Sequence, residues 1–297
     1  MKLFAYTGTT FSPSMTASFE VGLKEAGWPK SSDGAGHTVL ITYKPANGNY
    51  SNLDADIIAG DGANDMTVAF GGLRPAQAAD KNCMKPFLVL IGQIPRKFFF
   101  QSDSFCGGVN LDTPAQNVQR HDLLVDHYGI ANPKKVCLIW NQTGHMGERE
   151  KKEWKKRHWL EVSVTQNTTT AITQAFTDAK AAGATAVVLS ADPYFTSAMD
   201  TVVAAANDST TRQLEVCYPF SDYMNSYPNP PLAGHSMIYG PDLQFAYRLV
   251  GRKAGVILDA LSATAPGPDT GLASGILTDP IFVGGDPALA LSVGTAD

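Results

Sequence analysis

The chain has 297 residues, of which 44% are hydrophobic and 17% charged, and its formal net charge at pH 7 is -5. A chain of this length usually exceeds one compact core and divides into two domains. The acidic balance excludes a nucleic-acid partner, because phosphate binding needs a basic surface. The sequence also contains no run of 18 apolar residues, the length that a membrane-spanning helix needs.

Short apolar segments alternate with amphipathic segments along the chain, which is typical of parallel sheets with helices on both faces. Strands are predicted over residues 2–6, 38–43, 66–70, 87–91, 136–140, 160–164, 186–190 and 214–218. The first helix is predicted to begin at Ser12-Pro13 and to end at Gly27, because serine before proline starts helices and glycine stops them. Further helices are predicted near residues 51, 74, 113, 170 and 197, and over 242–261.

This order predicts an α/β fold made of two Rossmann-like lobes with parallel sheets. We expect the chain to leave the first lobe near residues 107–112 and to return through the proline-rich segment 227–240, where neither a helix nor a central strand persists. Lobe 1 is then 1–110 plus 240–270, and lobe 2 is 111–239. The tail 271–297 holds one short apolar segment, 280–283, which fits a strand of either lobe.

The four cysteines show no metal-type spacing, so no metal site is predicted. Cys137 and Cys217 lie in predicted buried strands, where a free thiol behaves as a small apolar group. Cys83 and Cys106 flank one strand. Whether they form a disulfide stays open, because spacing does not establish the geometry.

Ligands of open parallel sheets bind beyond the carboxyl ends of the strands. The residues that follow the predicted strands are therefore the candidate ligand-binding set: Thr9, Thr10, Ser12, Gly71, Gly72 and Gln93 in lobe 1, and Asn141, Asp192, Tyr194, Tyr218, Phe220 and Tyr239 in lobe 2.

Each candidate has a structural alternative. The hydroxyls of Thr9, Thr10 and Ser12 at a helix start suit a carboxylate or phosphate, but Ser12 is equally an N-cap. Asp192 suits a ligand amine, and its alternatives are a helix N-cap or simple exposure. The aromatic candidates suit an apolar or aromatic ligand group, and core packing is the alternative for each. Gly71-Gly72 allows close approach of a ligand or simply makes a turn.

Several motifs of enzymes are missing from the sequence. It contains no GxSxG, P-loop or HExxH motif, so no catalytic residue, cofactor or nucleophile and base pair is predicted. The charged run 148–157 mixes signs on a predicted helix, which indicates a solvated face or, alternatively, a docking surface.

Four segments give the chain a family resemblance. They are the helix 19–28, the strand 38–43 with the residues after it, the strand 133–141, and Tyr239-Gly240-Pro241-Asp242 with the helix that follows. In this order they resemble the substrate-binding proteins of ABC transporters, of the type I periplasmic fold and the tryptophan/tyrosine-type branch. In that family an acidic residue often stands where Asp192 lies.

The resemblance implies a receptor that closes by a multi-crossing hinge on a small molecule, an amino acid or related metabolite, held in the cleft between its lobes. It implies a monomer that delivers the ligand to an ABC transporter permease, and an extracytoplasmic location, periplasmic or lipid-anchored, after removal of a leader. The alternatives are a cytoplasmic chain, a ligand-sensing module for a membrane signalling partner, or an enzyme on the same fold.

Overall fold

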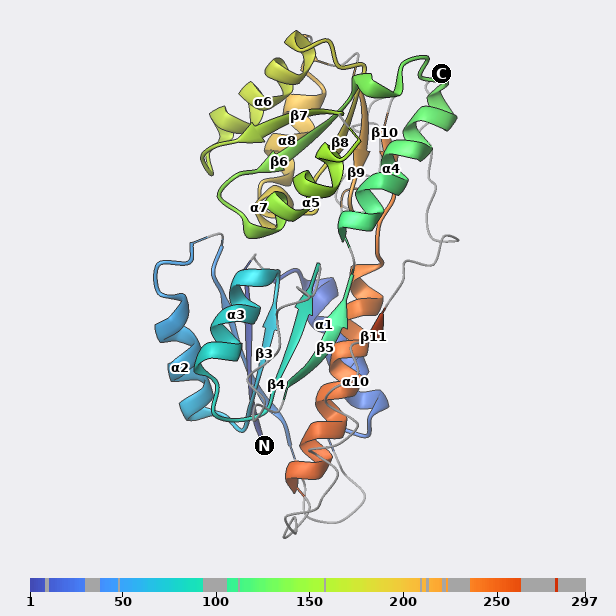
Figure 1. The fold of residues 1–297 in the computed structure, drawn as a ribbon. Coiled ribbons are helices and arrows are strands. Elements are labelled where there is room, and N and C mark those ends of the chain that lie inside the picture. The colour runs from blue at the N-terminus through green and yellow to red at the C-terminus, as the bar shows by residue number, and fades with distance from the viewer. Residues whose placement is uncertain are drawn as a thin grey trace. The chain divides into compact units, whose positions relative to one another are not determined.

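The computed structural model describes residues 1–8, 11–29, 38–47, 49–92, 106–111, 113–157, 159–208, 210–211, 214–220, 223, 236–262 and 281–282, with the backbone only at 106, 145–149 and 281–282. The chain divides into two compact units (Figure 1). Unit 1 combines the described residues of 1–111 and 243–283, and unit 2 those of 112–242. Within the described ranges no helix is long and apolar enough to cross a membrane.

Unit 1 is built on a six-stranded parallel sheet in the order β11-β5-β4-β3-β1-β2. Its elements are β1 (Lys2–Thr7), α1 (Pro13–Glu25), β2 (Leu40–Pro45), α2 (Leu53–Ala63), β3 (Met66–Phe70), α3 (Leu73–Asn82), β4 (Phe87–Ile91), β5 (Cys106–Asn110), α10 (Leu243–Ser262) and β11 (Ile281–Phe282).

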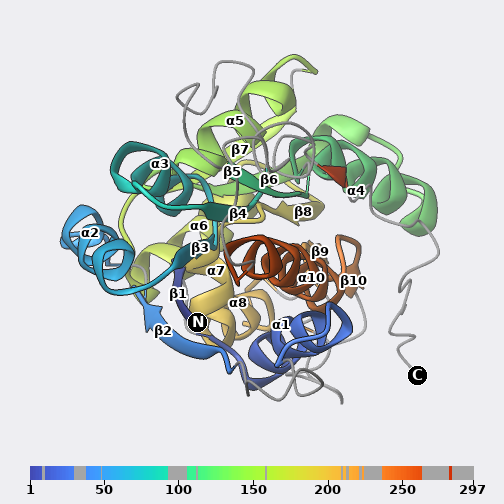
Figure 2. The ribbon, with the colours of Figure 1, turned by 90° about the horizontal axis from the view of Figure 1, so that it is seen from below.

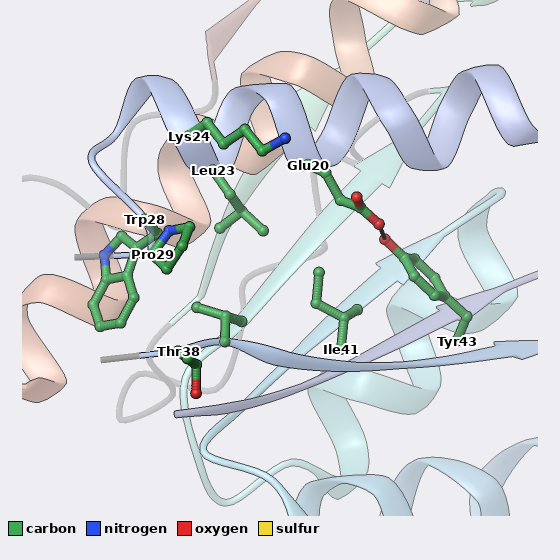
Figure 3. Close-up of a pocket in the computed structure, with 9 residues that line it drawn as sticks. Glu20, Leu23, Lys24, Trp28, Pro29, Thr38, Ile41 and Tyr43 are labelled. Atoms are coloured by element: carbon green, nitrogen blue, oxygen red, sulfur yellow. Dashed lines mark hydrogen bonds between the residues drawn. The ribbon is translucent and has the colours of Figure 1, made fainter. Parts of the chain in front are cut away.

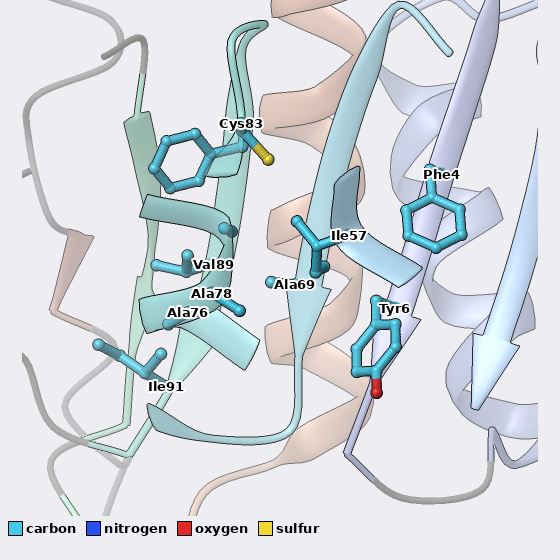
Figure 4. Close-up of a cluster of buried hydrophobic side chains, with 11 residues drawn as sticks. Phe4, Tyr6, Ile57, Ala69, Ala76, Ala78, Cys83, Val89 and Ile91 are labelled. Atoms are coloured by element: carbon cyan, nitrogen blue, oxygen red, sulfur yellow. The ribbon is translucent and has the colours of Figure 1, made fainter. Parts of the chain in front are cut away.

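Helices cover both faces of this sheet, α2 and α3 on one and α1 with α10 on the other (Figures 1 and 2). The α2–α3 face buries an apolar cluster that includes Phe4, Tyr6, Ile57 and Phe87 (Figure 4). On the opposite face Phe70 stacks on Tyr247 with ring centroids 4.4 Å apart. The strands are buried on both faces, which explains their continuous apolar sequences.

The first helix shows how local sequence fixes an element. Ser12 is the N-cap of α1, and its Oγ accepts a hydrogen bond of 3.2 Å from the N–H of Met15. Pro13 follows at the first helical position, which its fixed φ suits. Gly27 lies beyond the C-terminus with φ of 88°, a conformation that glycine adopts without steric cost. Both predicted ends of this helix are confirmed.

Unit 2 repeats the plan with a five-stranded parallel sheet in the order β10-β9-β8-β6-β7. Helices α4 and α5 pack on one face, and α6 and α8 on the other. Its elements are α4 (Thr113–Tyr128), the 3-10 turn η1 (Pro133–Lys135), β6 (Val136–Asn141), α5 (His145–Lys155), β7 (Leu160–Val164), α6 (Thr169–Ala181), β8 (Ala186–Leu189), α7 (Pro193–Ser197), α8 (Met199–Ala206), β9 (Glu215–Tyr218) and β10 (Ser236–Ile238).

The predicted fold class, α/β with two parallel-sheet lobes, is confirmed, and every predicted strand is present within two residues of its expected start. Two strands escaped prediction. Residues 106–110, which overlap the predicted break at 107–112, form β5. Its two glycines disfavour a strand, but pairing with β4 supplies the ladder hydrogen bonds. Residues 236–238 form β10, a short strand at the edge of the second sheet.

The tail contributes to unit 1, because β11 pairs with β5 in parallel register. Cys83, Cys137 and Cys217 are buried free thiols, and burial raises the pKa of each to about 12. The side chain of Cys106 lies outside the described residues, so its pairing with Cys83 stays a prediction.

Candidate functional site

Each sheet contains one point where the direction of strand addition reverses. In unit 1, β1 lies between β2 and β3, because the chain adds β2 on one side and then crosses to the other. In unit 2, β6 likewise lies between β7 and β8. Ligands of open α/β sheets bind beyond the carboxyl ends of the strands at such switch points. The two candidate regions are therefore the ends of β1 and β3 and the ends of β6 and β8.

The switch point of unit 1 is built from glycines. Gly71 and Gly72 follow β3 with φ of 80° and 114°, a region that other residues rarely adopt. A Cβ on Gly71 would lie 2.8 Å from the amide nitrogen of Gly8, and Gly8 itself donates a hydrogen bond of 3.3 Å to the carbonyl of Phe70. Glycine is therefore required after β3, because it lets this loop approach the loop after β1. The resulting tight turn also leaves its backbone accessible.

A tyrosine and an arginine border these glycines. A Cβ on Gly8 would overlap the Oη of Tyr50, and the Arg74 guanidinium lies over the Tyr50 ring, 5.4 Å from its centroid. Sequence reasoning missed both residues. Arg74 was detectable, because it stands two residues after Gly72 in the loop that follows a predicted strand. Tyr50 was not, because it reaches this point from the loop before α2.

The other predicted residues of unit 1 divide into two groups. Ser12 caps α1, so its predicted structural alternative is present, and its half-buried hydroxyl also lies 3.0 Å from that of Ser14. Thr9, Thr10 and Gln93 lie outside the described residues.

The switch point of unit 2 is closed by side chains instead. Asn141 ends β6 and donates a hydrogen bond of 2.9 Å from Nδ2 to the Oδ1 of Asp192, which follows β8. The same Asp192 oxygen accepts a bond of 2.9 Å from the N–H of Tyr194, so Asp192 is the N-cap of α7. Asp192 is 3% exposed, and Gly144 contacts its Oδ2 so closely that a Cβ there would overlap it.

A buried pair of opposite charges supports this loop from below. Arg120 of α4 and Glu150 of α5 are 0% and 1% exposed. Arg120 donates to the carbonyl of Tyr239 at 2.7 Å, to that of Leu189 at 3.4 Å, and to the side chain of Asn117. Glu150 accepts from the N–H of Ala191 at 3.4 Å. The pair therefore holds both the start of the Asp192 loop and the carboxyl end of β10.

Burial dominates the ionisation of both partners. Burial lowers the pKa of Arg120, and Glu150 and other neighbours partly offset this shift. Burial raises the pKa of Glu150, and the charge of Arg120 opposes that shift. Removing one of two opposite buried charges that interact is costly, because it leaves the other charge uncompensated.

Glu150 also corrects a sequence expectation. The run 148–157 was expected to form a solvated or docking face, and Lys152, Lys155, Lys156 and Arg157 are indeed exposed, but Glu150 and Trp154 are buried. Trp154 packs beneath the sheet and donates from Nε1 to the carbonyl of Leu160 at 2.7 Å. Tertiary packing decides here, since the alternating charges gave no sign that one acid points inward.

The predicted aromatic residues of unit 2 differ in accessibility. Tyr218 and Phe220 are 1% and 6% exposed, and Tyr218 stacks on Tyr223 with ring centroids 4.6 Å apart. Tyr194 and Tyr239 are half-buried. The Tyr239 hydroxyl is 2.9 Å from the Oε1 of Gln119, to which it donates. Tyr194 and Tyr239 therefore keep surface that a solute could contact.

Two grooves flank the edge strand β2 of unit 1. The larger, about 380 Å³, lies between α1 and β2 and is lined by Leu23, Ile41 and Trp28, with a 3.1 Å hydrogen bond from Tyr43 to Glu20 across it (Figure 3). The second, about 370 Å³, lies between β2 and α2. Both follow the side of the sheet, where parallel-sheet proteins do not place their ligands. Within the described part of the chain, no cluster of histidine, cysteine or acidic residues could hold a metal ion.

Comparison with known proteins gives the fold and no closer relationship. No family model and no curated protein matches the sequence. Among solved structures, a conserved domain protein of Vibrio cholerae is similar over 87% of this chain and 84% of its own, with a TM-score of 0.65 and 17% identity. The fold is that of the periplasmic-binding-protein-like proteins.

Two further neighbours have solutes in their structures. The ABC domain of Streptococcus pneumonia in complex with L-Trp is similar over 89% of this chain and 86% of its own, with a TM-score of 0.62 and 16% identity. A LacI family transcriptional regulator of Arthrobacter in complex with lactose is similar over 91% of this chain and 93% of its own, with a TM-score of 0.57 and 13% identity. This fold therefore serves both solute receptors and regulators.

Proposed function

We propose that this protein is an extracytoplasmic solute-binding receptor that delivers an amino acid or related small metabolite to an ABC importer. The observation that carries the proposal is the pair of switch points, each with polar groups gathered at the carboxyl ends of its strands. The neighbour in complex with L-Trp supports an amino acid as the solute. The proposed mechanism is closure of the two units on the solute by a hinge, and the role is non-enzymatic.

In this proposal the solute contacts the loops that end the strands. Gly71, Gly72 and Ser12, with Thr9, Thr10 and Gln93 of the same loops, contribute from unit 1. Asn141, Asp192, Tyr194, Tyr218, Phe220 and Tyr239 contribute from unit 2, with Asp192 receiving the amine. The Asn141 bond orients the Asp192 carboxylate, and a fixed, poorly hydrated carboxylate makes a strong charge-assisted contact with an amine.

Native mass spectrometry of the purified protein, followed by thermal unfolding with the L-amino acids, tests the function. At about 100 times its dissociation constant a true solute adds about 2.7 kcal/mol to the free energy of unfolding. Scattering with and without that solute tests closure, because a hinge motion changes the radius of gyration. If no solute co-purifies and none in the screen stabilises the protein, the receptor role is wrong.

Asp192→Asn tests the amine contact by calorimetry. Asparagine caps helices as well as aspartate does, so the substitution removes the charge and keeps the α7 cap. The expected loss is about 2 to 5 kcal/mol of binding free energy. Thr168→Ala, which removes the N-cap of α6, is the matched control, since it perturbs unit 2 without altering the switch point. Equal affinities of Asp192→Asn and wild type would remove Asp192 from the site.

The regulator in complex with lactose supports a second candidate, a ligand-sensing module that passes the signal to a partner. The same solute would bind in both cases. Reconstitution with candidate ABC permeases separates the two, because only a transport receptor stimulates ATP-driven uptake of the solute.

A further inference from the structure

Among the residues that the structure describes, Arg74 makes no hydrogen bond or ion pair, and its guanidinium lies 5.4 Å from the centroid of the Tyr50 ring. Arg248 and Arg252 of the same unit both pair with Glu25. Arg74 is only half-exposed, so its charge is not fully solvated either. A guanidinium held on an aromatic ring is pre-oriented for an anion.

The position of Arg74 is that of a ligand-binding group. It is the second residue of α3 and stands two residues after Gly72, at the switch point of the first sheet. The N-cap of α3 is Gly72, which has no side chain that could satisfy the first N–H groups of the helix. An anion beside the guanidinium would therefore also lie near these backbone donors.

A second and independent observation comes from Tyr6. Its side chain is 0% exposed, yet its hydroxyl has no hydrogen-bond partner within the described part of the chain. Figure 4 shows the hydroxyl pointing away from Phe4, in the direction in which β1 runs, toward the carboxyl ends of the strands. Tyr6 belongs to the same apolar cluster as Ala76, Ala78 and Ala79 of α3, so it lies on the face that α3 covers.

Tyr6 and Arg74 both carry donors suited to an anion. Burial, and then the charge of Asp56, raises the pKa of Tyr6 to about 12, so its hydroxyl is a proton donor at neutral pH. Asp56 has its own cation, Lys44, at 3.6 Å, and does not neutralise Arg74. One guanidinium with a planar fork of donors matches the single charge and two oxygens of a carboxylate.

We infer that Arg74, supported by Tyr50 and Tyr6, receives the carboxylate of the solute. The inference rests on the proposed receptor function and names the class of its ligand, a monocarboxylate. It also moves the carboxylate contact from the start of α1, where the hydroxyl of Ser12 caps the helix, to the start of α3.

Calorimetry with a defined panel tests the inference: the twenty L-amino acids, their C-terminal carboxamides, lactose and inorganic phosphate. The variants are Arg74→Gln, Arg74→Lys and the control Lys24→Gln, which removes one positive charge near the other end of α1. We expect a panel amino acid to bind wild type at least about 30-fold more tightly than its carboxamide, and Arg74→Gln to lose the same factor. Arg74→Lys should be intermediate, because it keeps the charge and loses the fork.

A second measurement does not depend on the panel. The 15N resonance of the Arg74 Nε–H, assigned by its absence in Arg74→Gln, should shift when sodium benzoate is added to otherwise solute-free protein. This shift would support the inference even if no amino acid in the panel binds.

The outcomes separate the inference from the receptor function. Lactose or a carboxamide bound equally by wild type and Arg74→Gln would keep the receptor and overturn the carboxylate assignment. Phosphate bound in place of carboxylates would overturn it too, as would equal losses in Lys24→Gln and Arg74→Gln. No binding of any panel member, together with an unmoved Arg74 resonance, would overturn both proposals.

Discussion

The two switch points share one topology and differ in what fills them. In unit 1 the ends of β1 and β3 meet through glycine backbone, and the nearby cation, Arg74, pairs with no acid of the described ranges. In unit 2 the ends of β6 and β8 meet through the Asn141–Asp192 hydrogen bond, and the cation beneath them, Arg120, is buried against Glu150.

This difference shows that similar residue types serve different purposes according to burial. Arg120 donates to the carbonyls of Leu189 and Tyr239 and so stabilises the unit itself. Arg74 leaves its donors for a partner from outside. In unit 2 the arginine is thus used within the unit, whereas in the described part of unit 1 the guanidinium of Arg74 is paired with no acid.

The largest expected effect comes from removing one of the two buried charges of unit 2. Arg120→Met should lower the free energy of unfolding by about 3 to 5 kcal/mol, because Glu150 is left buried and unpaired. Arg74→Gln, the matched change in unit 1, should alter it by no more than about 0.5 kcal/mol. Urea unfolding measures both. The double variant Arg120→Met/Glu150→Met should regain much of the loss, and equal effects of the two single variants would contradict the comparison.

A medium effect is expected from crowding the Asp192 loop. Gly144→Ala should cost about 1 to 3 kcal/mol of stability, since its Cβ would overlap the Asp192 carboxylate and displace it from Asn141. Gly62→Ala is the control, because a Cβ there meets no atom within 4 Å and its helix α2 favours alanine. Gly62→Ala should stabilise the protein. Thermal unfolding should therefore show a lower Tm for Gly144→Ala and a higher Tm for Gly62→Ala than for wild type.

Removal of the α1 cap sharpens the role of Ser12. Ser12→Ala should cost about 1 kcal/mol, and Ser12→Gly only a few tenths, because glycine is itself an acceptable cap. Chemical unfolding gives both values. A loss of solute affinity in Ser12→Gly with little loss of stability would restore Ser12 as the carboxylate contact in place of Arg74.

The smallest expected effect is on how the free energy of unfolding depends on pH. Burial raises the pKa of Glu150 in the folded protein, so its stabilising contribution is fully present below the ordinary glutamate pKa of about 4.3 and is lost as pH rises through the folded value. The free energy of unfolding of wild type should therefore fall relative to that of Glu150→Gln as pH rises from about 4. A difference that stays constant with pH would show that Glu150 keeps its ordinary pKa.

Local sequence determined the elements of this protein and their order. The apolar runs of β1, β3, β4 and β6 predicted strands buried on both faces, and Ser12-Pro13 with Gly27 fixed the ends of α1, because caps and periodicity act over a few residues. The alternation of strands and helices then predicted parallel sheets, and the loops that follow the strands contained Gly71, Gly72, Asn141 and Asp192 at the two switch points.

Tertiary structure alone decided which charges are satisfied. The sequence presents Glu150 within a mixed-charge helix and Arg120 within an amphipathic one, and only packing buries them together. β5 forms although its glycines disfavour a strand, since β4 supplies its hydrogen bonds. Tyr50, Tyr6 and Arg74 come from a loop, a strand and the first turn of a helix, and the fold of unit 1 brings Arg74 onto the Tyr50 ring. Pairing between distant segments sets these features, and no local pattern encodes it.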